Sequence, residues 1–600
     1  MNVLLGIDIG HVLQTHIRDG GLMRTRSILF SAGALTLSAS LLAVPGASAV
    51  KKAAKPKATT TTKAPAATAA PATTAAPAPV AATAGSVACT KTGGVFRDNW
   101  NLGAADAAHY DPGLVTELIG AQMNNMMYDG LTRINGLTGK LEADVAESYS
   151  SNATATVWTF KVRKGIKFSN GEDVLPSTFK RTWDRNVGPE FGSEYASLAS
   201  AFVNYQAIQD GKSKNLGVVA DDAKMTLTVN LSSPYGLLPD IMTHNFFFPL
   251  PKEAADMGNT WETKGTLVGN GAFKLEKHVI DQSARFVRND TYFGGIYGQK
   301  ACLDAVEMKV SKDPIVAYND FLAGNAEGGP IPVGKWKEAT GKFGDRAAPP
   351  TLNTNWLGFN WNDKTVGGFA NTKLRQAIQA SIDRDQIIEV INQGSVKPAL
   401  GFTPPGITGY KANLSKLVQN SKADKATAKK LYDEWSVGKS TPKIDYWYRN
   451  NSAATTLAQL LQAQIKDALG FEINLVPQVP RGYFGRVGTQ NPAMYQDGWI
   501  WDYNGYDNGL NELFGTQDDV SNNHTDFSVG SFDNLIKAAK ANPDKAKSAA
   551  QFNQAESIML DTAVVIPTTW GRNQNVVSAK VDTYPVTGFG FAEFALVSLK

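Results

Sequence analysis

The sequence predicts an α/β protein that is organised in two or more lobes. The chain has 600 residues, whereas a single hydrophobic core rarely grows beyond about 250–300 residues. Hydrophobic residues make up 43% and charged residues 19% of the chain, which is the composition of an ordinary globular protein. Segments with strand periodicity alternate with segments of helix periodicity from residue 89 onwards. This alternation favours α/β layers over an all-β fold or a helical bundle.

Residues 1–49 predict an N-terminal extension that ends in a secretory signal peptide. Arg24 and Arg26 precede an apolar run at 28–44, and an Ala-Ser-Ala sequence follows at 47–49. Signal peptides have this order of charged region, apolar region and cleavage site. The apolar run is shorter than the roughly 20 residues of a typical membrane span, so a cleaved signal peptide is favoured over an uncleaved anchor. We therefore expect an exported protein that is periplasmic, cell-wall-associated or extracellular.

Residues 50–88 are rich in Ala, Pro and Thr and predict a disordered linker. Such a segment has too little large apolar surface to offset the entropy lost on ordering. The positive charge of the chain is also concentrated at this end, because residues 1–85 hold eight of the 59 basic residues and two of the 55 acidic ones. The remaining 51 basic and 53 acidic residues do not produce the basic field of a nucleic-acid-binding protein.

Clear periodicity marks five elements of the folded part. Apolar and polar residues alternate in segments rich in strand-forming residues, which predicts strands at 157–163, 225–231 and 472–476. Apolar residues at helical spacing predict helices at 374–390 and 454–469. Gly470 follows the second helix directly and is expected to end it.

Motifs of catalytic and metal sites are absent from the sequence. There is no His-Glu-x-x-His, Gly-x-Ser-x-Gly or Walker-type sequence. The chain has no Cys-x-x-Cys, and its six His residues are scattered. We therefore expect no catalytic residues, no metal site and no cofactor. A pair of catalytic carboxylates stays open as an alternative, because the sequence does not show which carboxylates meet in space.

The two cysteines, Cys89 and Cys302, predict one disulfide. An even number of cysteines in an exported protein favours pairing. The alternative is two unpaired thiols, one of them close to the end of the folded part.

Aromatic residues lie beside acids and glycines at 498–504, in the order Gly-Trp-Ile-Trp-Asp-Tyr-Asn. One interpretation is a ligand pocket, in which aromatic faces supply apolar area and Asp502 binds a cationic group. The other is an apolar strand that ends in a turn-forming Asp. Composition alone favours the structural interpretation.

Seven motifs in a fixed order along about residues 92–600 add information that no single motif carries. They lie at 128–132, 144–149, 158–171, 268–275, 288–293, 374–384 and 401–405. Together they resemble the extracellular solute-binding proteins of the peptide/nickel/opine class, and within it the oligopeptide-binding branch.

The resemblance implies a two-lobe, periplasmic-binding-protein-like (Venus-flytrap) fold of α/β type with two hinge crossings. The crossings are expected near 351–355 and 561–566. Lobe 1 would then comprise 89–352, lobe 2 would comprise 353–563, and 564–600 would return to lobe 1. A ligand that contacts both lobes shifts such a protein towards its closed state.

The resemblance also implies roles for individual residues. Asp502 matches an acid that pairs with the ligand's α-ammonium, and burial would strengthen such a pair. The backbone of Gly498, Trp499 and Ile500 matches a strand that pairs with the peptide main chain. A second contact of this kind is expected on the first lobe, and the residues that match it are Asp129 and Leu131, with Asn270 in a neighbouring turn.

One departure from the oligopeptide-binding pattern concerns the ligand's carboxylate. An Arg commonly precedes the Gly-Trp pair in that branch, whereas this chain has Gln496 and Asp497. Either Arg481 or Arg486 binds the carboxylate instead, or the ligand is not a simple peptide.

The resulting prediction is a monomeric, non-enzymatic solute-binding protein that captures peptides and delivers them to the permease subunits of an ABC importer. Three alternatives remain open at this point. The same fold could bind an oligosaccharide stacked on Trp499 and Trp501, an opine or a nickel chelate. The chain could be a secreted hydrolase, or a surface adhesin or scaffold held on its Ala/Pro/Thr-rich segment.

Overall fold

The structure, a computed structural model, describes residues 80–81, 89–100, 106–264, 267–516 and 522–600. The expected signal peptide and most of the expected linker lie outside these residues. Within the linker segment, β1 (Val80–Ala81) pairs in antiparallel register with β5 (Ala146–Ser151). At these two residues the structure differs from the predicted linker, because their backbone extends the edge of a sheet.

The first lobe contains an antiparallel five-stranded sheet with the order β1-β5-β6-β8-β7. Its remaining strands are β6 (Val157–Val162), β7 (Val218–Asp221) and β8 (Thr226–Asn230). The strands predicted at 157–163 and 225–231 are confirmed to within one residue at each end. The helices of this part are α2 (Pro176–Asn186), α3 (Tyr205–Gln209), α4 (Leu238–Ile241) and α5 (Lys252–Met257).

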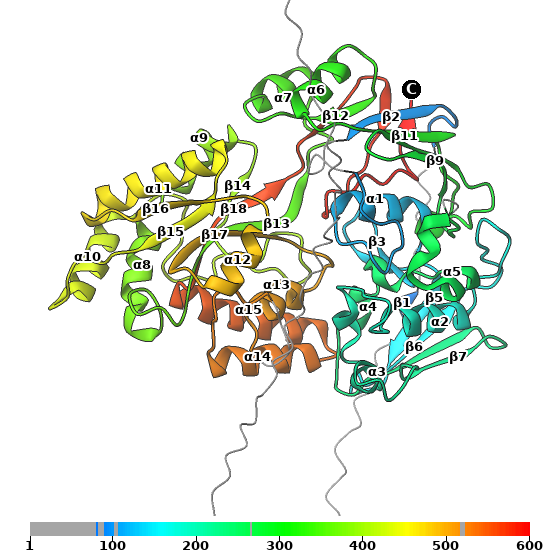
Figure 1. The fold of residues 1–600 in the computed structure, drawn as a ribbon, viewed down its shortest axis with the longest axis horizontal. Coiled ribbons are helices and arrows are strands. Elements are labelled where there is room, and N and C mark those ends of the chain that lie inside the picture. The colour runs from blue at the N-terminus through cyan, green and yellow to red at the C-terminus, as the bar shows by residue number, and fades with distance from the viewer. Residues whose placement is uncertain (1–79, 82–88, 101–105, 265–266, 517–521) are drawn as a thin grey trace, which may run out of the picture. The chain divides into compact units, whose positions relative to one another are not determined.

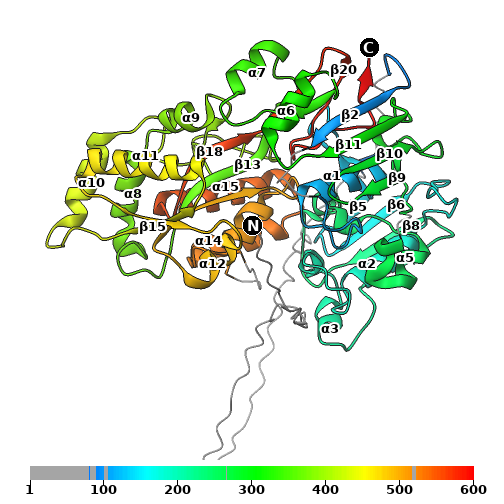
Figure 2. The same cartoon turned by 45° about the horizontal axis from the view of Figure 1, so that its top comes forward.

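A second, six-stranded sheet of the first lobe has the order β19-β12-β2-β11-β10-β9. Its strands are β2 (Val95–Trp100), β9 (Phe273–Val279), β10 (Ser283–Arg288), β11 (Ala305–Val310), β12 (Gly328–Pro330) and β19 (Asn575–Val577). The central strand β2 runs parallel to both of its neighbours, β11 and β12. Helices α1 (Leu118–Met127), α6 (Pro314–Leu322) and α7 (Trp336–Phe343) accompany this sheet, and β3 (Thr132–Ile134) with β4 (Leu141–Ala143) and β20 (Val581–Thr583) with β21 (Ser598–Leu599) form small pairs. Figure 2 shows α6 and α7 at the end of the lobe that carries β2.

The second lobe is built on a six-stranded sheet with the order β14-β18-β13-β17-β15-β16 (Figure 1). The strands are β13 (Pro350–Phe359), β14 (Lys397–Pro398), β15 (Asp445–Arg449), β16 (Asn474–Gln478), β17 (Met494–Ile500) and β18 (Val565–Arg572). The helices are α8 (Thr372–Ser381), α9 (Arg384–Asn392), α10 (Lys425–Ser436), α11 (Ser452–Leu469), α12 (Tyr483–Gln490), α13 (Tyr506–Phe514), α14 (Gly530–Ala541) and α15 (Lys545–Thr562).

Both faces of this sheet are buried, and successive residues of a strand point to opposite faces. In β13, Trp356 packs in one core with residues of α13, α14 and α15, whereas Leu357 packs in another core with residues of α8, α10 and α11. Val565 and Ile566 of β18 divide in the same way. The sheet therefore holds helices on both faces, and the predicted α/β class is confirmed.

Two connections join the lobes. The chain leaves the first-lobe sheet after β12 and enters the second-lobe sheet at β13, and it returns between β18 and β19. The sequence placed the return at 561–566, but the chain stays in the second-lobe sheet as far as Arg572, because β18 pairs with β13 as far as Pro350. The return connection lies between Arg572 and Asn575.

The helix predicted at 374–390 is wrong in its continuity, because the structure divides it into α8 and α9. Ile382 has an extended backbone after α8, and the side chain of Asp383 accepts a hydrogen bond of 2.9 Å from the backbone N–H of Gln386. An Asp cap of this kind starts a new helix. The prediction for α11 is confirmed, since Gly470 follows it with φ of 79°. The strand predicted at 472–476 lies two residues later, as β16.

The two lobes also touch away from their connecting strands, through the segment 235–240. Tyr235 donates a hydrogen bond to the Asp507 carboxylate, and Lys545 Nζ lies 3.0 Å from Asp240 Oδ2. The backbone N–H of Gly236 donates to the carbonyl of Lys540 at 2.8 Å. A Cβ at residue 236 would lie 2.3 Å from the carbonyl oxygen of Asn542, so this close approach requires glycine. We call these the rim contacts.

Candidate ligand-binding site

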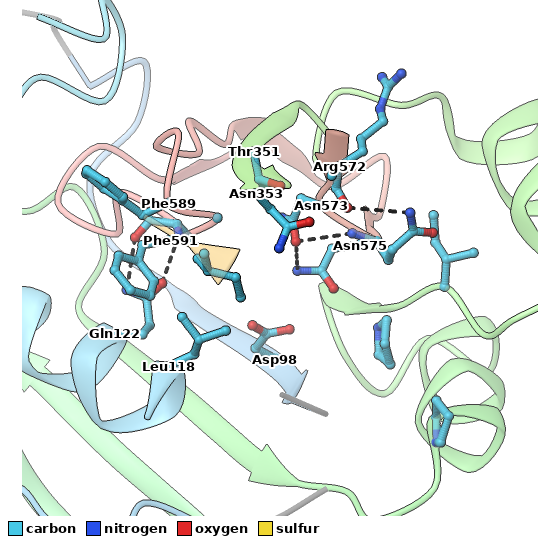
Figure 3. A pocket seen from close by; sticks show the side chains of 18 of the residues that line it. Asp98, Leu118, Gln122, Thr351, Asn353, Arg572, Asn573, Asn575, Phe589 and Phe591 are labelled. Carbon is cyan, nitrogen blue, oxygen red and sulfur yellow. Dashed lines mark hydrogen bonds between the residues drawn. The ribbon is translucent and has the colours of Figure 1, made fainter. Parts of the chain in front are cut away.

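Two of the cavities between the lobes together have the size of a small-ligand site. The central cavity has a volume of about 540 Å³. Its first-lobe wall includes Val115, Leu118, Tyr195, His244, Asn245 and Phe591, and its second-lobe wall includes Asn355, Arg449, Phe484, Gly498, Trp499 and Asp502. The side cavity has a volume of about 410 Å³ (Figure 3). The two share Leu118, Asn353, Ile500, Phe589 and Phe591, so they are adjacent parts of one cleft.

Strand β17 forms the floor of the central cavity and has one edge without a strand partner. On one side β13 pairs along it, from Phe359 opposite Met494 to Asn353 opposite Ile500. On the other side β15 pairs only with Met494 and Tyr495. Among the described residues, the stretch 498–500 therefore has no strand beside this edge. A free edge of this kind can add an extended peptide as a further strand. Ile500 keeps 38% of its surface exposed where it lines both cavities.

Asp502 lies just beyond this strand, and Asn508 of α13 fixes its position. Asn508 Oδ1 accepts hydrogen bonds from the backbone N–H of Asp502 at 2.9 Å and from the indole of Trp499 at 3.0 Å. Asn508 Nδ2 donates to the Asp502 carboxylate at 2.9 Å. Burial raises the pKa of Asp502 to about 6, although the hydrogen bond from Asn508 lowers it; the Glu512 charge adds to the rise. No cation of the described residues pairs with this carboxylate.

Arg449, at the end of β15, supplies a positive charge to the same cavity. Its guanidinium lies 5.4 Å from the ring centre of Phe484, and its buried Nε has no hydrogen-bond partner. In the part of the chain that the structure describes, no carboxylate pairs with it. The acid nearest to Arg449 along the neighbouring strand is Asp497, which lies level with it if the register of the two strands is continued. Asp497 does not pair with Arg449, because its Oδ2 lies 3.1 Å from Nδ1 of His524.

The register gives the separation of the two charges along the sheet. Tyr446 of β15 lies opposite Met494, and Trp447 lies opposite Tyr495, in parallel strands. Continuing this register places Arg449 level with Asp497, five residues before Asp502. At about 3.3 Å per residue, the two Cα levels are about 16 Å apart along the strand direction.

The sequence missed Arg449 and suggested Arg481 or Arg486 instead. The guanidinium of Arg486 donates to the carbonyls of Arg481 and Val479, and neither of these arginines lines the two cavities. In the sequence, Arg449 is only a basic residue at the end of a segment with strand periodicity. Its place in the cavity follows once β15 is known to lie beside β17.

The structure brings four of the predicted ligand-binding residues together, Gly498, Trp499, Ile500 and Asp502, all in the wall of the central cavity. It places the other three, Asp129, Leu131 and Asn270, outside that wall.

Two hydrogen bonds join Asp129 and Asn270. The backbone N–H of Asp129 donates to Asn270 Oδ1 at 3.1 Å, and Asn270 Nδ2 donates back to the Asp129 carbonyl at 2.9 Å. The carboxylate of Asp129 pairs with Arg133. The carbonyl of Leu131 accepts from the backbone N–H groups of Asp144 and Ala146. These hydrogen bonds hold the three residues within the first lobe, and their contact with a ligand stays a prediction.

The two cysteines form a disulfide in the structure. The Cα atoms of Cys89 and Cys302 lie 5.6 Å apart, within the usual range for such a bond. The bond joins Cys89, near the start of the folded part, to Cys302, which lies just before β11.

The described residues hold no metal-binding cluster and no membrane-spanning helix. They contain no group of three or more His, Cys, Asp or Glu side chains placed to hold a metal ion. None of their helices is long and apolar enough to cross a membrane.

Comparison with known proteins identifies the family. A profile described as "Bacterial extracellular solute-binding proteins, family 5 Middle" matches residues 140–521. The oligopeptide-binding protein OppA of Bacillus subtilis is 26% identical over 78% of this chain and 87% of its own length. The periplasmic murein peptide-binding protein MppA of Escherichia coli is 28% identical over 80% of this chain and 89% of its own length. The solved structure of MppA in its unliganded open form has a TM-score of 0.73 and 26% identity, and covers 86% of this chain and 98% of that protein. The two-lobe fold is thereby confirmed, and the chain belongs to the bacterial extracellular solute-binding proteins of family 5.

Proposed function

We propose that this protein is an exported, monomeric receptor that binds short peptides with free ends in its interlobe cleft and delivers them to an ABC importer. The observation that carries the proposal is the pair of opposite, uncompensated charges at Asp502 and Arg449, separated by the free edge of β17. The printed names of the relatives, an oligopeptide-binding and a murein peptide-binding protein, support the same ligand class.

The charges fit the two ends of a peptide. An α-ammonium would pair with Asp502, and a C-terminal carboxylate would pair with Arg449, whose planar guanidinium suits a carboxylate. An unpaired charge inside a protein is unfavourable, so a ligand that neutralises both charges gains binding free energy at both ends.

The free strand edge fits the part of the ligand between these ends. Hydrogen bonds from the backbone of 498–500 would hold the peptide main chain without contacting its side chains. An extended chain spans about 3.3–3.6 Å per residue, so the separation of about 16 Å between the two Cα levels corresponds to peptides of roughly three to five residues. The proposal leaves Asp129, Leu131 and Asn270 out of the ligand contacts.

An oligosaccharide is less well supported by the same wall. Trp501 is only 1% exposed and cannot present a ring face to a sugar. Trp499 lines the cavity, but its indole N–H is already bonded to Asn508.

The proposal is tested by calorimetric titration of tri-, tetra- and penta-alanine in free, N-acetylated and C-amidated forms. We expect Asp502→Asn to weaken binding of the free peptides by roughly a hundredfold or more, because it leaves a buried ammonium unpaired. Binding of the N-acetylated peptides should already be weak and change little further. Arg449→Gln should likewise weaken binding of the free peptides. Binding of the C-amidated peptides, which lack the carboxylate, should already be weak and change little further.

A matched control and two outcomes complete this test. Asp433→Asn removes an acid on α10 that is 54% exposed, and it should leave every affinity unchanged. Equal losses for free and acetylated peptides in Asp502→Asn would contradict the ammonium contact. Failure of all the free peptides to bind the wild-type protein would contradict peptide capture itself.

We also propose that the protein does not turn its ligand over. Mass spectrometry of the peptides after prolonged incubation with the protein should recover them intact. Cleavage that disappears in a variant of a single cleft carboxylate would instead support the hydrolase alternative.

A further inference from the structure

The side cavity contains a charged residue that the proposed binding of peptide ends does not use. Many of its walls are neutral: Asn99, Gln122, Asn353, Asn573, Gln574 and Asn575 supply carboxamides, and Tyr584, Phe589, Phe591 and Phe594 supply aromatic rings. The carboxamides are held by bonds within the protein. For example, Gln122 forms two hydrogen bonds with the backbone of Ala592, and Asn573 donates to the carbonyl of Ala347. Figure 3 shows Asp98 among these residues, with its carboxylate directed into the cavity.

Asp98 lies where strand periodicity would place an apolar residue. It is on the central strand β2, two residues after Phe96, so the two side chains share a face of the sheet. Phe96 is fully buried on that face and stacks on Tyr584 at a centroid distance of 5.5 Å. Asp98 itself is partly exposed, towards the cavity, and a partly buried acid without a partner is unfavourable.

The neighbouring strand makes room for this carboxylate. Gly328 of β12 lies directly opposite Asp98 in the parallel register. A Cβ at residue 328 would lie 2.8 Å from Asp98 Oδ1, so any larger residue would displace the carboxylate. The space around Asp98 is thus formed by the backbone of the sheet as well as by the cavity.

No positive charge of the described chain compensates Asp98. Its carboxylate forms no hydrogen bond or ion pair among the described residues. The neighbouring Arg97 pairs with Glu327. Arg572 lines the cavity through other atoms, while its guanidinium bonds Asp345 and lies over the ring of Trp336; in Figure 3 it points away from Asp98. Burial without a counter-charge raises the pKa of Asp98 to about 7.

We propose that the side cavity is a subsite for a cationic side chain of the bound peptide, that of Lys, Arg or another amine-bearing residue, which pairs with Asp98. This inference rests on the proposed peptide binding and specifies which peptides are preferred. The ligand reaches the subsite past Ile500, because that residue lines both cavities. The aromatic rings around the cavity suit the methylene stem of such a side chain, and their faces also attract a cation.

The subsite is tested with tetrapeptides of alanine in which one position at a time is Lys or norleucine. Norleucine keeps the apolar stem of Lys and lacks its ammonium. At one position we expect the wild-type protein to bind the Lys peptide roughly ten- to a hundredfold more tightly than the norleucine peptide, the range expected for a hydrogen bond to a charged group. In Asp98→Asn this preference should disappear, while affinity for the norleucine peptide is kept.

Asp290→Asn is the matched control, because it removes a first-lobe acid that is 81% exposed; it should keep the preference for Lys. If Asp98→Asn does not fold, the comparison of Lys with N-acetyl-lysine peptides on the wild-type protein replaces it, and acetylation should remove the preference. Equal binding of Lys and norleucine peptides at all four positions would overturn the subsite and leave peptide capture intact. Absence of binding by every peptide would overturn peptide capture and the subsite together.

Discussion

The first lobe and the interlobe cleft both contain buried or partly buried charged side chains. They differ in whether these side chains have ion-pair partners within the protein. In the first lobe, Arg133 pairs with the carboxylates of Asp129 and Glu593, with side chains that are 13%, 1% and 4% exposed. We call these three residues the Arg133 cluster. In the cleft, Asp502 and Arg449 line the same cavity, and neither forms an ion pair with a described residue. The charges of the cluster are compensated within the protein, whereas we propose that a ligand compensates the two cleft charges.

Asp144 shows that a missing partner alone does not identify a site. Its carboxyl is buried, and neither of its oxygens has a hydrogen-bond partner. Burial raises the pKa of Asp144 well above its usual range, and the nearby charge of Asp129 adds to the rise. It also lines neither of the two interlobe cavities. A binding residue therefore needs both an open position on a cavity and an uncompensated charge.

The largest expected effect comes from breaking the compensated cluster. Arg133→Met leaves two buried carboxylates without their shared partner, so the free energy of unfolding should fall by about 3–5 kcal/mol. Asp502→Asn in the same denaturant titration should cause no loss. Similar losses of unfolding free energy in the two variants would show that the charge of Asp502 is compensated within the protein, like those of the Arg133 cluster.

Removal of the disulfide tests fold stability and ligand binding separately. Replacing Cys89 and Cys302 together by Ala should lower the free energy of unfolding by about 2–4 kcal/mol, because the bond closes a long loop of the unfolded chain. The affinity for tetra-alanine should stay within about twofold of the wild type, since neither cysteine lines the cleft. A tenfold loss of affinity would mean that the cleft depends on this bond.

The smallest expected effect is a pH dependence of ligand affinity, caused by the ionisation of Asp502 in the cleft. Because the pKa of Asp502 is about 6 in the folded protein, lowering the pH from 7 to 5 protonates the carboxylate that binds the ligand's ammonium. Calorimetry should show affinity for tetra-alanine falling by roughly tenfold over this range. In Asp502→Asn the affinity should be low and nearly independent of pH. A pH-independent affinity in the wild-type protein would contradict the role of Asp502.

The same shift has a consequence for stability with the opposite sign. A carboxyl whose pKa is raised on folding stabilises the fold below its unfolded pKa of about 3.9, and this stabilisation is lost as pH rises through about 6. Asp502→Asn should therefore be at least as stable as the wild type at pH 7, and this advantage should vanish near pH 4. Thermal melts across this range measure the difference.

The sequence was most informative where the structure depends on neighbours in the chain. Strand periodicity located β6 and β8, and the Gly470 cap located the end of α11. The motif at 498–504 placed β17 and Asp502 in one local unit, which the structure sets in the cleft wall. The division between α8 and α9 was missed because Ile378, Ile382 and Ile387 continue the helical spacing across the capping residue.

The sequence was least informative where charges meet across long separations. The Arg133 cluster depends on Glu593, 460 residues further along the chain, so nothing near Asp129 indicated that its carboxylate is already paired. Arg449 belongs to the site only because β15 lies beside β17. Asp98 is recognisable as unusual only after Phe96 is known to face the core of a central strand.

The rim contacts bear on how quickly a captured ligand leaves. Tyr235 with Asp507, Lys545 with Asp240, and Gly236 with Lys540 join the lobes at positions that do not line the two cavities. A ligand enclosed between the lobes escapes only when the lobes part, and parting breaks all three contacts. The residence time of a ligand is thus set in part by residues that never touch it, so two peptides of different affinity can share a common limit on their rate of release.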